Sequence, residues 1–138
     1  MKYDVIVKNA RIPQGDGTAL TNILVKDEKI SGFVDCAEGI EAKEVIDAKG
    51  FLTLPGCIDS HTHFMYQGFN HRENFVTGSA AAARGGITTI IDMPLNSSPP
   101  TTTVAGLEAK EEAARGQLSV DVGFWGGAVP GNIDQMAP

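Results

Sequence analysis

Two histidines one residue apart, His61 and His63, have the residue type and the spacing to bind a metal ion. On an extended strand, residues i and i+2 point to the same side, so both imidazoles can face one point. A catalytic zinc site takes about three protein ligands and a water, so the pair supplies part of such a site. Asp59 could orient a ligand histidine through a hydrogen bond. The alternative is that the histidines lie by chance in a solvated loop and that Asp59 is a polar strand end.

The chain from residue 51 onward predicts the strands that would position this pair. A short apolar strand, Cys57–Asp59, precedes the histidines, and further strands are expected at 87–91 and 118–124. Helix-favouring segments separate these strands, and this order predicts an α/β fold with parallel strands. Barrel enzymes carry their catalytic groups at the carboxyl ends of such strands, which is where the histidines are expected.

Two helices are predicted between these strands. The alanine run 80–83 strongly favours helix, so the first helix is expected at 72–84, with Gly85 in the left-handed cap position. Thr103 is expected to cap the start of the second helix, and Gly116 is expected to close it.

The first 50 residues have a different pattern, with short apolar alternations separated by polar and glycine-containing turns. Residues 3–7 alternate as a strand does, and residues 19–34 are predicted to form a hairpin with its turn at 27–28. Residues 45–47 could add another short strand. We therefore expect a small antiparallel sheet, with the boundary between the two halves of the chain near residue 50.

Composition limits the classes of partner. The 138 residues contain 11 Lys and Arg against 17 Asp and Glu, a formal net charge of −6, which argues against nucleic acid or an anionic membrane surface. No uncharged apolar run approaches the roughly 20 residues of a membrane helix. Asp4 lies where a signal peptide would be apolar, so a cytoplasmic protein is expected. Cys36 and Cys57 are expected to be reduced thiols.

Several motifs resemble those of a known family. Residues 54–63, LPGCIDSHTH, look like the signature of the cyclic amidohydrolases within the metal-dependent amidohydrolase superfamily. Residues 80–96, which end in MPLN, resemble the allantoinase form of the motif. Residues 98–103 and 121–127, the latter DVGFWGG, continue that match. Dihydroorotases and dihydropyrimidinases share the H-x-H segment, but the MPLN and VGFWGG strings favour the allantoinase branch.

The resemblance implies the start of a TIM (β/α)8 barrel, preceded by part of a small β-sandwich domain. Residues 1–50 would be the N-terminal part of the sandwich, and residues 51–138 would be the first β/α units of the barrel. It also implies two divalent metal ions, usually zinc, bridged by a carbamylated lysine and a hydroxide. The implied reaction is hydrolysis of a cyclic amide, the opening of allantoin to allantoate in purine degradation, by a homotetramer.

The resemblance assigns roles to three residues of this sequence. His61 and His63 match the first two metal ligands of the family. Asn96 matches the asparagine of the MPLN motif, whose amide could donate to and accept from a polar ureide substrate. An alternative for Asn96 is that it simply makes the loop turn before Pro99.

Other features differ from the family pattern. The segment 64–70 keeps only Gly68 of the residues that commonly follow H-x-H in allantoinases, so its side chains either reshape the pocket or simply pack. The bridging lysine, two more histidines and the catalytic aspartate are expected beyond Pro138, and Lys110, expected in the middle of a helix, is a poor substitute. We therefore expect the 138 residues alone to be inactive. The alternatives are another cyclic amidohydrolase, such as a hydantoinase or dihydroorotase, and a non-catalytic assembly protein.

Overall fold

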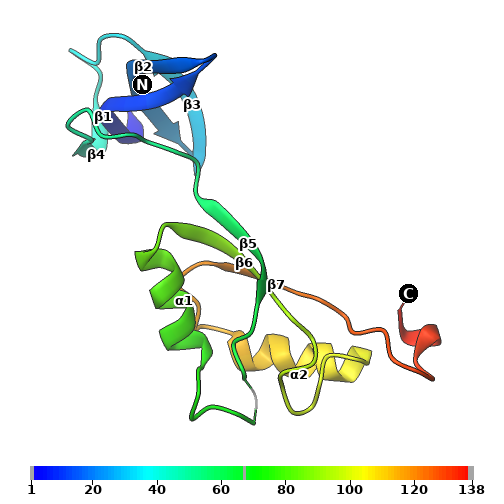
Figure 1. Cartoon of the computed structure of the whole chain (residues 1–138). Coiled ribbons are helices and arrows are strands. Elements are labelled where there is room, and N and C mark those ends of the chain that lie inside the picture. Colours follow the sequence, from blue (N-terminus) through cyan, green and yellow to red (C-terminus); the bar gives the residue numbers. More distant parts are fainter. Residues whose placement is uncertain (1, 67, 137–138) are drawn as a thin grey trace. The chain divides into compact units, whose positions relative to one another are not determined.

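The computed structural model describes residues 2–66 and 68–136, and its chain divides into two compact units, Met1–Pro55 and Gly56–Pro138 (Figure 1). The division falls close to the boundary near residue 50 that the sequence predicts. Within the described residues, none of the helices has the length and apolar character that crossing a bilayer requires. Cys36 and Cys57 are both free thiols with exposed positions.

The first unit is a four-stranded sheet in the order β3-β2-β1-β4. Its strands are β1 (Tyr3–Gln14), β2 (Gly17–Lys26), β3 (Lys29–Val34) and β4 (Ala42–Asp47). The predicted hairpin is present as β2 and β3, and the two turn residues, Asp27 and Glu28, both have positive φ. A two-residue turn with positive φ at both positions matches the right-handed twist of the strands it joins.

The expectation of a purely antiparallel sheet is wrong for β4, which pairs parallel to β1. A tight turn after β3 would have produced another antiparallel neighbour, but residues 35–41 instead cross the sheet to its opposite edge. Crossover connections of this kind are what parallel pairing requires. The Asn9 side chain donates to Asp47 Oδ1 at 2.8 Å across the β1–β4 pair, and this hydrogen bond lowers the pKa of Asp47.

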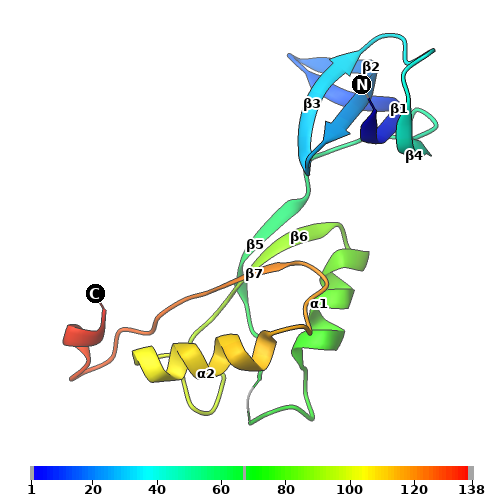
Figure 2. The same ribbon diagram turned by 180° about the vertical axis from the view of Figure 1, so that it is seen from behind.

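The second unit alternates strands and helices in the predicted order. Its elements are β5 (Cys57–Thr62), α1 (Phe75–Arg84), β6 (Ile87–Asp92), α2 (Val104–Ala114), β7 (Asp121–Phe124) and the short 3-10 helix η1 (Ile133–Gln135). The strands form a parallel sheet in the order β5-β6-β7, with both helices beside it (Figures 1 and 2). The predicted parallel β/α arrangement is therefore confirmed.

The ends of the helices follow their caps. The α1 helix begins later than predicted because the Asn74 side chain accepts a hydrogen bond from Thr77 N at 3.0 Å and so caps the helix there. At its other end Gly85 keeps a right-handed φ of −83°, and Gly86 takes the left-handed conformation at +82°. The expectation for Gly85 is therefore wrong by one residue. Thr103 caps α2 as predicted, accepting from Gly106 N at 3.1 Å.

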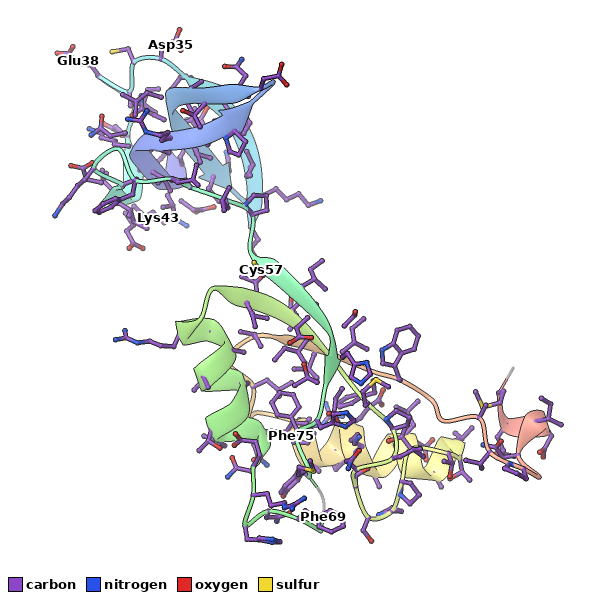
Figure 3. All side chains as sticks on the ribbon, in the orientation of Figure 1. Asp35, Glu38, Lys43, Cys57, Phe69 and Phe75 are labelled. Atoms are coloured by element: carbon purple, nitrogen blue, oxygen red, sulfur yellow. The ribbon has the colours of Figure 1, made fainter. Side chains whose placement is uncertain are left out.

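An aromatic cluster forms the core of the second unit. Phe75, labelled in Figure 3, is fully buried at the start of α1. It makes edge-to-face contacts with three rings, at centroid distances of 5.1 Å to Phe64, 5.1 Å to Tyr66 and 6.0 Å to Phe124. Phe64 and Tyr66 belong to the segment that departs from the family pattern. Their role here is packing, whereas Phe69 in the same segment is 40% exposed.

Gly78 lies where α1 meets Phe64, and we predict that Gly78→Ala destabilises the second unit. An added Cβ would lie 2.4 Å from Phe64 Cε1, so the ring or the helix must move. Overpacking of this kind costs about 1–3 kcal/mol, which outweighs the roughly 1 kcal/mol that alanine gains over glycine in a helix. Urea denaturation of the two proteins measures the difference.

Gly85→Ala is the matched control. Its φ is negative, and an added Cβ would meet nothing closer than 3.4 Å, so the free energy of unfolding should change little. Equal stabilities for the parent and Gly78→Ala would contradict the tight helix–ring packing described above.

Candidate metal centre

The two histidines lie at the carboxyl end of β5, where the sequence predicts them. His61 belongs to the strand and His63 follows it, and both are exposed, with ring centroids 5.3 Å apart and the ring planes inclined by 66°. Thr62, between them, is partly buried, as expected of a residue that points to the other side of an extended chain. Rings this close on one side of a strand can both reach one ion through Zn–N bonds of about 2.0–2.1 Å.

Asp59 acts on the backbone of this segment. Its Oδ1 accepts a hydrogen bond from the backbone N–H of His61 at 3.0 Å. The carboxylate therefore holds the peptide that leads into the histidine pair. Asp59 thus contacts His61 through its backbone N–H.

The carboxyl ends of the three strands are joined by hydrogen bonds at the same edge. Met93 N donates to Thr62 O at 2.8 Å, which connects β6 to β5. Trp125 N donates to Asp92 O at 3.0 Å, and the Trp125 indole N–H donates to Ser60 O at 3.0 Å. The edge that carries the histidines is thus a continuous hydrogen-bonded layer.

A buried ion pair lies beneath this edge. Asp92, at the end of β6, and Lys110, in α2, have side chains only 2% and 3% exposed, and Lys110 Nζ lies 2.7 Å from Asp92 Oδ2. The other carboxylate oxygen, Oδ1, accepts from Phe64 N at 2.9 Å. Lys110 Nζ also donates to Met93 O at 3.2 Å and lies 5.7 Å from the centre of the Phe124 ring.

Sequence reasoning considered Lys110 only as a replacement for a bridging lysine and gave Asp92 no role. In α2, Lys110 follows Gly106 by one turn and precedes Ala114 by another, and all three are buried in the structure. A lysine buried in this way needs an acidic partner, because a buried charge is costly unless it is paired.

Asn96 lies exposed in the loop that follows β6. Hydrogen bonds to the Pro94 carbonyl shape this loop, from Thr101 N at 2.9 Å and from Ser97 Oγ at 3.4 Å. These bonds hold the turn through residues on either side of Asn96. The asparagine side chain takes no part in these two bonds.

The histidine pair alone does not complete a metal site. In the part of the chain that the structure describes, no group of three or more His, Cys, Asp or Glu side chains is arranged to hold a metal ion. A donor set of two imidazoles fits zinc and similar divalent ions, and a complete site would need further ligands.

Residues 52–134 match the Amidohydrolase family. The chain belongs to this family. The amidohydrolase chain is similar to the allantoinases of Escherichia coli O1:K1 and of Escherichia coli O139:H28 (strain E24377A), with 42% identity over 136 residues in each case. These matches cover 99% of this chain and 30% of each relative, so the chain spans 30% of the length of the allantoinases it matches.

Solved structures of hydantoinases share the fold of this amidohydrolase chain. The L-hydantoinase (dihydropyrimidinase) from Arthrobacter aurescens matches 96% of this chain and 30% of its own, with a TM-score of 0.90 and 42% identity. A D-hydantoinase matches 88% of this chain and 26% of its own, with a TM-score of 0.73 and 32% identity. The resemblance to cyclic amidohydrolases is therefore confirmed, and the α/β fold matches the start of these enzymes.

We predict that replacing both histidines, His61→Ala with His63→Ala, greatly lowers the metal content of the full-length protein, because two of the donor nitrogens are lost. Elemental analysis of the purified protein measures the metal bound per chain. His71→Ala is the control, since His71 is exposed on the loop before α1 and outside the pair. A double variant that retains the parent's metal content would show that the pair is not part of the site.

Proposed function

We propose that the protein is a metal-dependent cyclic amidohydrolase that opens the ring of allantoin to give allantoate. The observation that carries the proposal is the placement of His61 and His63, on one side of a parallel strand at its carboxyl end. The 42% identity to allantoinases over nearly the whole chain supports allantoin as the substrate.

The proposal includes the architecture of the complete protein. Residues 1–50 would be the N-terminal part of a β-sandwich, and residues 51–138 the first β/α units of a (β/α)8 barrel. The parallel order β5-β6-β7 and the close structural match to L-hydantoinase support the barrel. Exposed apolar side chains on and before β5 also support it, since Ile58 is 68% exposed and Leu54 56% exposed, and further chain would cover such residues in a larger fold.

In this proposal His61 and His63 hold a divalent metal ion, most simply zinc, through neutral imidazole nitrogens. When bound, such an ion polarises the substrate carbonyl and makes its water acidic enough to act as a nucleophile near neutral pH. A carbamylated lysine and the remaining ligands would come from chain that follows residue 138.

Asn96 is proposed to bind the substrate. Its amide can donate to one carbonyl and accept from one N–H of a cyclic ureide, which orients the ring. The loop that carries it follows β6, whose carboxyl end is hydrogen-bonded directly to the end of β5. Binding by one neutral group fixes orientation and adds a modest amount of affinity.

We predict that Asn96→Ala raises the KM for allantoin about tenfold, which is the effect of losing roughly 1.4 kcal/mol of binding, while the metal content stays unchanged. Steady-state kinetics of the full-length enzyme with elemental analysis measure both quantities. Ser98→Ala, at an exposed position of the same loop, is the control and should keep the parent's KM. An unchanged KM in Asn96→Ala would remove the residue from the binding site.

The second candidate substrate is a hydantoin or a dihydropyrimidine. The TM-score of 0.90 to L-hydantoinase, at the same 42% identity as the allantoinases, favours it specifically. The unusual segment 64–70 beside the histidines is a further reason to test it, because residues bordering a pocket select among rings of similar chemistry.

Assays of the full-length protein with allantoin, a 5-substituted hydantoin and dihydrouracil separate the candidates. We expect the highest kcat/KM for allantoin, because the MPLN and VGFWGG segments match the allantoinase branch. Turnover of a hydantoin without turnover of allantoin would replace the proposed substrate but keep the reaction class. A protein that binds no metal and opens none of the rings would instead be a non-catalytic relative.

A further inference from the structure

The buried pair Asp92–Lys110 takes part in neither metal binding nor substrate binding as proposed above. Both side chains are almost completely removed from water, and their charged atoms lie 2.7 Å apart. Removing two charges from water is costly, and their attraction repays the cost only when the geometry is good and the other polar atoms are satisfied. Here the remaining hydrogen bonds of the pair are specific, and they lie at the carboxyl ends of β5 and β6.

The first of these contacts fixes the peptide directly after His63. Asp92 Oδ1 accepts from Phe64 N at 2.9 Å, and Phe64 N belongs to the peptide bond that begins at the His63 carbonyl carbon. On the other side of His63, Thr62 O accepts from Met93 N at 2.8 Å. The backbone on both sides of His63 is therefore held by two consecutive residues of β6 and its end.

Lys110 fixes both of those residues at once. Its ammonium group donates to the Asp92 carboxylate and, at 3.2 Å, to the Met93 carbonyl. A lysine has three donors and no acceptor, so a single side chain can satisfy several oxygens. Through Lys110, the position of α2 is connected to the position of the His63 backbone.

We infer that Asp92 and Lys110 are positioning residues, which hold the His61–His63 pair in the geometry that binds metal. The inference rests on the proposed function, because it assigns the pair a role in that metal site. The alternative is that the ion pair only stabilises the core and that the histidines would bind metal equally well without it.

Two double variants of the full-length protein distinguish these alternatives. Asp92→Asn with Lys110→Gln removes both charges but keeps an amide oxygen that can accept from Phe64 N. Asp92→Leu with Lys110→Met also removes both charges and keeps similar volumes, but it leaves Phe64 N without that acceptor. Apolar replacement of a buried ion pair is often tolerated, so the second variant is expected to fold.

The measurement is Co²⁺ affinity of the metal-free proteins, by competition with a chelator, together with the visible spectrum of the Co²⁺ form and the thermal unfolding midpoint. We expect the Asn/Gln variant to bind Co²⁺ within about threefold of the parent, because the bond to Phe64 N survives. We expect the Leu/Met variant to bind Co²⁺ about 10- to 100-fold more weakly and to show an altered spectrum. Losses of this size are typical when a residue that orients a metal ligand is replaced. Equal affinities and spectra in two folded variants would overturn the inference.

Asp92→Glu replaces the Leu/Met variant if that protein does not fold. It keeps the carboxylate for Lys110, but the extra methylene moves the acceptor oxygen relative to Phe64 N. We expect weaker Co²⁺ binding and an altered spectrum, and unchanged binding would overturn the inference. If the parent binds Co²⁺ but opens no cyclic amide, only the proposed reaction fails. A parent that binds no Co²⁺ would overturn both.

Discussion

The second unit is organised around the carboxylate of Asp92. One carboxylate oxygen accepts from Phe64 N, just after β5, and the other accepts from the Lys110 ammonium group in α2. The backbone carbonyl of Asp92 accepts from Trp125 N, just after β7. Asp92, at the end of β6, is therefore hydrogen-bonded to the segments that follow β5 and β7 and to α2. Placing that residue in the interior requires a cation, because an unpaired carboxylate would be too costly to bury. Lys110 satisfies this requirement, and in doing so it fixes the helix relative to the sheet.

The aromatic cluster restrains the same segment in a different way. Phe64 is bound to Asp92 through its backbone and packs against Phe75 through its ring. Phe64, the residue immediately after His63, is thus held by a polar contact at its backbone and by an apolar contact at its ring. The absence of a side chain at Gly78 is what allows α1 to approach that ring so closely. Phe64 and Tyr66, in the segment that departs from the family pattern, thus belong to the core of the second unit beside the histidine pair.

The parts of this structure that could be predicted from sequence depend on local information. The period-two geometry of a strand places His61 and His63 on one side, and helix caps and glycines mark the order of the elements. The predicted antiparallel direction of β4 was wrong, because the direction of this strand depends on which edge of the sheet the chain reaches. The ion pair was missed because Asp92 and Lys110 lie on different elements and only the fold brings them together.

Trp125 is the only tryptophan of these 138 residues, and its indole N–H is bonded to the Ser60 carbonyl beside His61. Indole emission is sensitive to hydrogen bonding and to solvent, and this side chain is about half exposed. The chain therefore carries an intrinsic fluorophore attached to the strand end that bears the histidines. Events at that strand end can be followed optically, without any label and without turnover.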